Sequence, residues 1–111
     1  MVIKLMFRIL TTQEFDKDFK KLSSQEQERV NKMLKQLKEQ GGGIGKPLSG
    51  LSFFREKKVD GKRLYYLVYK TFYVVLAIAI SDKKVQQATI NKILLDLAEY
   101  QQYVYNLVNK K

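Results

Sequence analysis

The order of apolar and polar positions predicts a strand followed by two helices in the first half of the chain. The run Met1–Leu10 is apolar and β-branched, which is typical of a strand. Phe15, Phe19 and Leu22 then recur at helical spacing. A second, longer helix is indicated by one apolar stripe: Val30, Met33, Leu34 and Leu37. Two helices this close together predict an αα-hairpin.

Polar residues and glycines mark the ends of these helices. Thr11 stands three residues before Glu14, the spacing of a capping box with Thr11 as N-cap, and Ser23 with Glu26 repeats the pattern. The glycines of residues 41–45 end the second helix, because glycine readily takes the left-handed conformation that closes helices. We expect residues 46–50 to form an extended connector.

Residues 51–84 predict a three-strand antiparallel meander. Asp60-Gly61 lies between two alternating runs and is typical of a two-residue type I′ turn. A tight turn pairs Lys58 with Arg63, so alternation assigns the side chains to two faces. One face carries Glu56, Lys58, Arg63 and Tyr65, and the other carries Arg55, Lys57, Leu64 and Tyr66. A longer loop with a bulge would shift the pairing by one residue and exchange partners.

The run Phe72–Ile80 is apolar on both faces and predicts an interior strand. Its neighbours are expected to be Lys62–Lys70 and Met1–Leu10. The predicted sheet order is therefore the N-terminal strand, the last strand, the middle strand of the meander and the first strand of the meander. A single helix of about residues 83–109, capped by Ser81 or Asp82, is expected to cover one sheet face.

These elements predict an α+β fold in a single domain that spans residues 1–111. The tail Tyr100–Lys111 has two interpretations. Its tyrosines contact a partner, or they belong to a frayed end with half-buried rings.

Composition restricts the chemistry. The chain has no Cys and no His, which excludes disulfides and thiolate catalysis and leaves Glu, Asp, Tyr or Lys for proton transfer. We expect neither a metal nor a cofactor. No segment approaches the roughly 20 apolar residues of a membrane span, and Lys4 and Arg8 interrupt the first apolar run, so we expect a cytoplasmic protein.

The net charge of +10 is unevenly distributed. Residues 46–84 carry nine cations and three anions, whereas residues 11–40 carry seven and six. A cationic sheet beside a nearly neutral helical segment indicates a polyanionic ligand, and the alternative is charge that only keeps the domain soluble. Guanidinium and ammonium groups of the hairpin can bind a phosphodiester: Arg63, Lys58 and one or more of Lys46, Arg55 and Lys57. Lys83 and Lys84, expected in the first turn of the last helix, can receive an anion together with its backbone N–H groups.

Five segments in a fixed order carry a resemblance to a known family. They are the αα-hairpin, the KPLSGL connector, the FREKKVDGKRLYYLVY hairpin, the apolar strand and the ISDKKVQQATINKI helix. Together, from about Phe15 to Ile93, they resemble the RelE/ParE toxins of type II toxin–antitoxin systems. The most specific piece is Gly61–Tyr66, which resembles the family's strand of glycine, any residue, arginine, an aliphatic residue, any residue and tyrosine.

The resemblance implies a RelE-like endoribonuclease that enters the ribosome and cleaves mRNA by turning the 2′-OH onto the adjacent phosphate. Arg63 matches the arginine that stabilises the charge of the transition state, and Lys83 falls near the basic residue after the last strand. Lys58, Lys57 and Arg55 match a basic cluster, without deciding which of them is catalytic, and Glu56 is a candidate base. The expected catalytic set is Arg63, Lys58, Lys57, Glu56 and Lys83, with RNA contacts from Lys46, Arg55, Lys62, Lys84 and Tyr65.

The stretch Val85–Thr89 departs from the family's pattern. Many of its nucleases hold a Tyr or His here as acid or base, and this chain has neither. A ParE-like inhibitor that binds DNA gyrase needs no such residue and remains an alternative, as does a non-catalytic RNA-binding relative. A toxin of this family implies an acidic antitoxin partner that folds onto apolar surface from Phe15, Phe19, Leu34 or the sheet edges.

Overall fold

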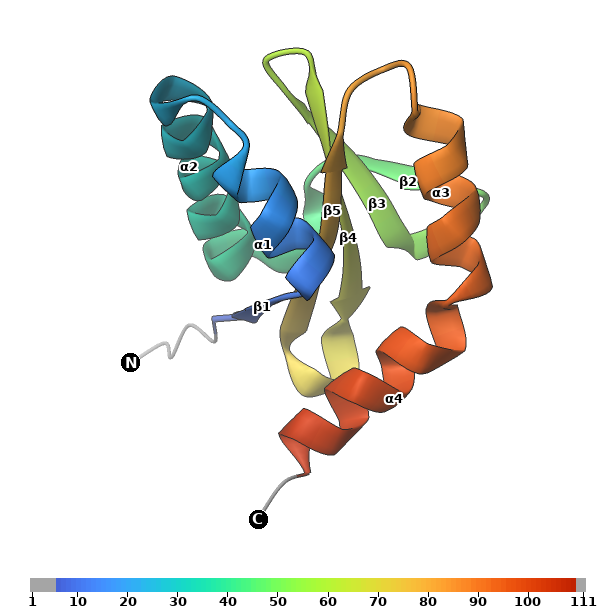
Figure 1. The fold of residues 1–111 in the computed structure, drawn as a ribbon. Coiled ribbons are helices and arrows are strands. Elements are labelled where there is room, and N and C mark those ends of the chain that lie inside the picture. Colours follow the sequence, from blue (N-terminus) through green and yellow to red (C-terminus); the bar gives the residue numbers. More distant parts are fainter. Residues whose placement is uncertain (1–5, 110–111) are drawn as a thin grey trace.

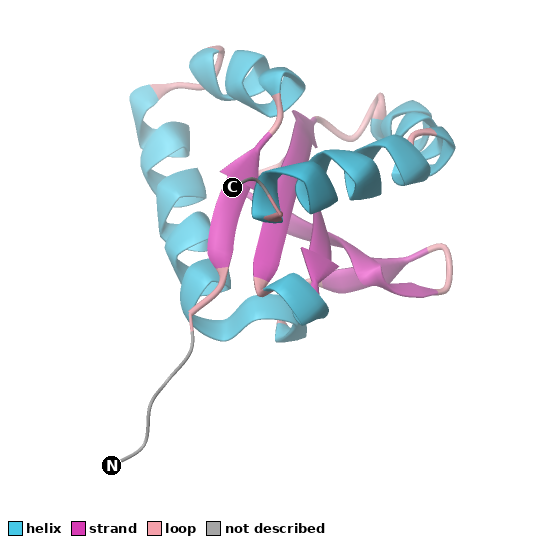
Figure 2. Cartoon of the chain, turned by 90° about the horizontal axis from the view of Figure 1, so that it is seen from below, coloured by secondary structure: helices cyan, strands magenta, loops and turns pink. Residues whose placement is uncertain are grey.

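The computed structural model describes residues 6–109 and shows one mixed sheet with helices on both faces (Figures 1 and 2). The sheet order is β1-β5-β4-β3-β2, with β1 parallel to β5 and the other pairs antiparallel. The strands are β1 (Arg8–Thr11), β2 (Lys46–Leu48), β3 (Leu51–Val59), β4 (Lys62–Tyr69) and β5 (Val74–Ser81). The predicted α+β class and the relative order of the four expected strands are confirmed. Residues 1–5 of the predicted first strand lie outside the described part of the chain.

The predicted four-strand sheet is incomplete, because the expected connector forms a fifth strand at the edge. In this strand, β2, Lys46 pairs with Glu56 and Pro47 with Arg55 before the register shifts at Leu48. Proline has no N–H to donate to a ladder, so it is tolerated on an edge strand and not inside the sheet. Because Lys46 pairs directly with Glu56, the edge strand brings another cation onto the face that carries Glu56.

Four α-helices form the two outer layers: α1 (Gln13–Lys20), α2 (Ser24–Gln40), α3 (Gln86–Leu95) and α4 (Leu97–Val108). The α1–α2 hairpin buries Phe15, Val30, Met33 and Leu37 against Leu64, Tyr66, Val68 and Val75. On the other face, α3 and α4 bury Ile90, Ile93 and Val104 against Phe54, Tyr65, Leu67 and Leu76. Both faces of β4 and β5 are therefore covered, in keeping with their continuous apolar character.

The cap of α2 agrees with the sequence and the cap of α1 does not. Ser23 Oγ accepts from the Glu26 N–H (3.2 Å), and the Glu26 carboxylate accepts from the Ser23 N–H (3.0 Å) and thereby has its pKa lowered. The predicted N-cap Thr11 is instead the last residue of β1, and Thr12 caps α1 by accepting from the Phe15 N–H (3.0 Å). The Thr12 hydroxyl also donates to the Ile78 carbonyl (2.6 Å), which fixes α1 to the edge of β5.

The predicted single C-terminal helix is wrong, because the chain breaks at Asp96 into α3 and α4. A straight helix over residues 83–109 would be about 40 Å long, whereas a nine-residue strand spans about 30 Å. The break turns α4 across the lower end of the sheet in Figure 1, where Val104 is buried. Within residues 6–109, no helix is long and apolar enough to cross a membrane.

The start of α3 also differs from the prediction. The helix begins at Gln86, so Lys83 and Lys84 lie in the loop before it and not in its first turn. Asp82 Oδ1 accepts from the N–H groups of Lys84 (3.0 Å) and Val85 (3.3 Å), which holds this loop in a turn. The predicted anion site, made of these lysines in the first turn and the N–H groups of the helix, is therefore not formed as expected.

Candidate functional site

The β3–β4 hairpin positions the candidate site through its turn. Asp60 and Gly61 have φ values of 52° and 78°, as the predicted type I′ turn requires. The register is also as predicted, with Lys58 opposite Arg63 and Glu56 opposite Tyr65. An ion pair between Arg29 of α2 and Asp60 ties the turn to the helical layer. The tight-turn assignment of the two faces is thus confirmed, and the alternative with a shifted register is excluded.

The site face is the sheet face toward α3, and two rows of residues cross it. Lys46, Glu56 and Tyr65 pair across β2, β3 and β4, and the next row contains Lys58, Arg63 and Ser81. Glu56 is 6% exposed and Arg63 7% exposed, whereas Lys46 and Lys58 are exposed. The face therefore combines one buried pair of opposite charges with cations at the surface.

The buried pair is made of Glu56 and Arg63. Arg63 Nε lies 3.4 Å from Glu56 Oε1, which is close enough for an ion pair. Gln86 Nε2, from the first turn of α3, donates to the same carboxylate oxygen at 2.7 Å. Arg63 Nε itself is enclosed and has no hydrogen-bond partner among the described residues. Two buried opposite charges are held together here mainly by Coulomb attraction, which is little screened away from water.

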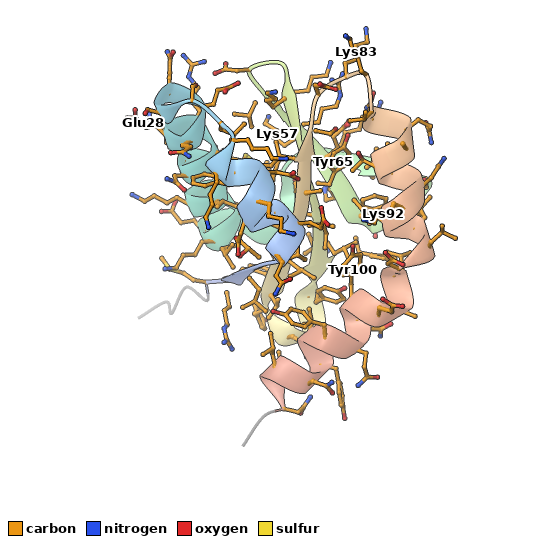
Figure 3. The ribbon with its side chains drawn as sticks, viewed as in Figure 1. Glu28, Lys57, Tyr65, Lys83, Lys92 and Tyr100 are labelled. Atoms are coloured by element: carbon orange, nitrogen blue, oxygen red, sulfur yellow. The ribbon has the colours of Figure 1, made fainter. Side chains whose placement is uncertain are left out.

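Tyr65 lies inside the protein, beside this pair. Its hydroxyl shares a 2.8 Å hydrogen bond with Ser81 Oγ, and Ser81 donates in turn to the Asp82 carbonyl (3.0 Å). Burial raises the pKa of Tyr65, so its hydroxyl stays protonated and neutral. Figure 3 shows the ring between the sheet and α3. The structure thus places this residue under the helix and not on a surface that RNA can reach.

Three predicted site residues, Lys57, Arg55 and Lys62, lie on the opposite face; Lys62 does so because it pairs with Val59 and directly precedes Arg63 in β4. Lys57 pairs with Leu64, whose side chain is in the core under α1 and α2, and Figure 3 shows Lys57 on that side. The Arg55 guanidinium donates to the carbonyl oxygens of Ile44 (2.8 Å), Gly45 (2.9 Å) and Ser52 (3.0 Å). The structure therefore does not bring Lys57 or Arg55 together with Arg63, and Arg55 instead holds the loop after α2.

The remaining predicted cations lie around the hairpin end of the molecule. Lys62 is half-buried beside the turn, and Lys83 and Lys84 are exposed in the loop between β5 and α3. Figures 1 and 3 show this loop and the hairpin turn at the same end of the protein. A strand of polyanion that crosses this end would meet positive charge before it reached the buried pair.

No family model and no curated protein matches the chain. Solved structures do match it. A chain of the intact Escherichia coli RelBE toxin–antitoxin complex aligns with a TM-score of 0.61 and 25% identity over 69% of this chain and 95% of that one. An E. coli RelE mutant in the free state aligns with a TM-score of 0.66 and 22% identity over 79% of this chain and 98% of that one. The chain has the fold of the RelE toxins.

The RelE-like fold recurs in more distant structures. A chain of the RelBE2 toxin–antitoxin complex from Mycobacterium tuberculosis aligns with a TM-score of 0.62 and 17% identity, over 71% of this chain and 93% of that one. The sequence resemblance to this fold is thus confirmed at the level of three-dimensional structure.

Gln86 is a residue of the candidate site that the sequence did not predict. The sequence showed that Val85–Thr89 contain no Tyr or His, but it did not predict a role for the glutamine at residue 86. Its spacing to Ile90 and Ile93 was an available signal, because residues at i, i+4 and i+7 share one helix face. Since both isoleucines are buried against the sheet, Gln86 had to face the sheet as well.

The described residues of the candidate site do not form a cluster of metal-ligating side chains. Within residues 6–109, no group of three His, Cys, Asp or Glu side chains could hold a metal ion. The groups that can take part in chemistry at the site face are one carboxylate, one guanidinium and the surrounding ammonium groups. These groups can bind a phosphate and transfer protons.

Proposed function

We propose that this protein is a RelE-like toxin that cleaves mRNA on the ribosome. The observation that carries the proposal is the shared face of Glu56, Lys58 and Arg63, set by a tight hairpin on a RelE-like sheet. The face places a carboxylate, an ammonium and a guanidinium within two adjacent cross-strand rows. When a neighbouring hydroxyl attacks a phosphodiester, such groups can serve as the base, the acid and the group that stabilises negative charge.

The proposed reaction is an attack within the RNA chain. The Glu56 carboxylate accepts the proton of the ribose 2′-OH, and the 2′-oxygen forms a bond to the adjacent phosphorus. The bond from phosphorus to the 5′-oxygen breaks, and that oxygen takes a proton from the Lys58 ammonium. The products are a 2′,3′-cyclic phosphate and a 5′-hydroxyl. Arg63 stabilises the negative charge on the equatorial oxygens as the transition state forms.

Cations outside the reacting groups are proposed to position the RNA. Lys46 of β2 lies on the site face beside Glu56, and Lys83 and Lys84 lie in the loop before α3, whereas Lys62 faces the other side of the sheet. Contacts of this kind bind phosphates independently of base identity and weaken as salt rises. They would hold the backbone of the mRNA while Arg63 and Glu56 act on one phosphodiester.

Primer extension on an mRNA that is being translated in the presence of the purified protein tests this function. The expected result is cleavage that depends on the ribosome and leaves a 5′-hydroxyl on the downstream fragment. The same mRNA without ribosomes is the control for nonspecific nuclease activity. An intact message after incubation with folded protein would contradict the proposal.

Consecutive lysines of β3 provide a matched test of the face assignment. Lys58→Met is expected to lower kcat/KM for cleavage about tenfold to hundredfold, the range for losing one hydrogen bond to a charged group. Lys57→Met removes the same charge one residue away but from the opposite face, so cleavage is expected to stay near the parent rate. Rates of single-site mRNA cleavage measure both. Equal losses in the two variants would assign the effect to net charge and not to the site.

A second candidate function rests on the first turn of α3. Gln86 stands where an acid or base side chain would be useful, so the face can bind an anion without cutting it. A ParE-like inhibitor of DNA gyrase that acts by binding fits this observation. Supercoiling assays with purified gyrase distinguish the two functions, since a gyrase inhibitor blocks supercoiling while leaving translated mRNA intact.

We propose an acidic antitoxin as the partner, by analogy with the RelE–RelB complexes to which the fold is similar. The net charge of +10 is expected to steer an acidic chain, and steering is screened beyond about 8 Å at physiological ionic strength. Co-expression with the neighbouring reading frame should yield a stable complex. Its association rate should fall as salt rises, with a smaller change in the dissociation rate. A protein that purifies alone, or an association rate that is indifferent to salt, would contradict this partner.

A further inference from the structure

Gln86 and Arg63 both approach the same oxygen atom of Glu56. Gln86 Nε2 donates to Glu56 Oε1 at 2.7 Å, whereas Arg63 Nε is 3.4 Å from the same atom and makes no hydrogen bond with the described residues. A buried guanidinium beside a carboxylate normally forms short, paired hydrogen bonds, because an enclosed N–H without a partner is costly. In the observed arrangement, the donor delivered by α3 is the closer of the two to this carboxylate oxygen.

The position of Gln86 is determined by packing that does not depend on its own side chain. Ile90 and Ile93, one and two turns further along α3, are buried against β4 and β5. The Asp82 turn fixes the start of the helix from the other end. The Gln86 amide is therefore directed at Glu56 by the backbone, and its length allows it to reach the carboxylate oxygen.

We propose that Gln86 is a positioning residue, which holds the Glu56 carboxylate off Arg63 and so keeps the guanidinium available for an RNA phosphate. The inference rests on the proposed function and deepens it by assigning a role at the same site. Without the glutamine, Glu56 would close onto Arg63 as a bonded pair. The guanidinium would then be occupied and would not be available to an RNA phosphate.

Charged and titratable groups reach Glu56 from several elements. Lys46 of β2 is its cross-strand neighbour, Lys58 is on the same face of its own strand, and β4 contributes Arg63 and Tyr65. Strand β5 contributes the uncharged Ser81, which is bonded to Tyr65. The described first turn of α3 contributes no acidic side chain. A charged substitution at residue 86 therefore changes the electrostatics of Glu56 against these named neighbours alone.

Three substitutions at Gln86 separate positioning from simple support. Gln86→Leu removes the donor at similar size and is expected to lower kcat/KM about tenfold to hundredfold. Gln86→Lys keeps a donor to Glu56 and is expected to retain kcat/KM within about threefold of the parent. Gln86→Glu repels the carboxylate toward Arg63 and should lower kcat/KM as much as the leucine variant does. The same three changes at Gln87, which is exposed and bonds Asn91, are the matched controls and should leave cleavage unchanged.

The pH profile provides a readout that a purely structural role would not move. An ammonium at residue 86 favours the charged form of Glu56, so the acid limb of kcat/KM should shift to lower pH in Gln86→Lys. A second carboxylate disfavours it, so the acid limb should shift to higher pH in Gln86→Glu. Acid limbs that stay in place in both variants, with cleavage otherwise measurable, would overturn the inference.

NMR of the Arg63 Nε–H tests the contact without any activity. In Gln86→Leu this proton should move downfield and exchange more slowly, because it gains the carboxylate oxygen that the glutamine released. An unchanged signal in a folded variant, as judged by its amide spectrum, would overturn the inference whatever the cleavage result. The Gln86→Leu variant could show the expected NMR change while the parent protein cuts no translated mRNA. That result would overturn the proposed function and the catalytic part of this assignment.

Discussion

Replacing Gly45 by alanine is expected to lower the free energy of unfolding by about 3 kcal/mol, the sum of a left-handed backbone and a steric clash. Gly45 has a φ of 82°, and an added Cβ would lie 2.6 Å from the Glu56 backbone oxygen and in contact with the Tyr66 hydroxyl. The backbone atom belongs to a central position of β3 and cannot rotate away. Urea unfolding followed by circular dichroism measures the effect.

The loop around Gly45 is also bonded to the sheet. The Gly45 and Ile44 carbonyls accept from Arg55, and the Ile44 carbonyl accepts from the Tyr66 hydroxyl, whose burial raises its pKa to about 12. Moving the loop to admit a methyl group would weaken these bonds and shift β3 at Glu56. We therefore expect the substitution to lower cleavage in addition to stability.

Gly50→Ala is the matched control. Gly50 has a similar φ of 71°, but an added Cβ would meet no atom within 4 Å. Only the backbone term should remain, about 1 kcal/mol. If the two variants unfolded at the same urea concentration, the close approach of Gly45 to β3 would be contradicted.

Replacing Arg63 by alanine is expected to remove about 2 to 4 kcal/mol of transition-state stabilisation for mRNA cleavage, the usual cost of losing a group that binds the developing charge. The same change leaves Glu56 buried, with the Gln86 amide but without its neighbouring positive charge. Stability should therefore fall as well, by about 3 to 5 kcal/mol if the carboxylate stays ionised. Cleavage rates and urea unfolding must be measured on the same preparations.

Arg63→Lys separates the two effects. Lysine keeps a positive charge near Glu56 but lacks the planar pair of donors that binds phosphate with two hydrogen bonds. The lysine variant should be closer to the parent in stability than the alanine variant, yet should still cleave slowly. Arg29→Ala removes an exposed arginine from the ion pair with Asp60 and should leave the free energy of unfolding nearly unchanged, with cleavage unchanged. Parent-like cleavage by folded Arg63→Ala would withdraw the arginine from the site.

Features of the fold that depend on local rules could be predicted from the amino-acid sequence. Asp60-Gly61 predicted the turn because few residue pairs accept two positive φ values, and the turn set the register of β3 and β4. Since side chains alternate along a strand, the register in turn placed Glu56, Lys58, Arg63 and Tyr65 on one face. The position of β5 inside the sheet followed from its apolar faces.

The accessibility of each residue on the site face depends on tertiary packing and could not be predicted in this way. Alternation assigns a face, but it does not reveal that α3 covers Tyr65 and buries Arg63, because coverage depends on where a helix distant in sequence packs. Arg55 was predicted as an RNA contact, but its guanidinium bonds the Ile44 and Gly45 carbonyls of the loop after α2 and a carbonyl of its own strand. The sequence does not show which acceptor a long, flexible cationic side chain will bind in the folded protein.

The C-terminal helices show the same division. Helical periodicity predicted the apolar stripe of residues 90–107 but not the break at Asp96, since both sides of the break have helical sequence and the turn serves to fit the length of the sheet. The role of Gln86 was likewise decided by packing. A glutamine has no chemistry that marks it in a sequence, and it became a site residue when α3 placed its amide 2.7 Å from Glu56.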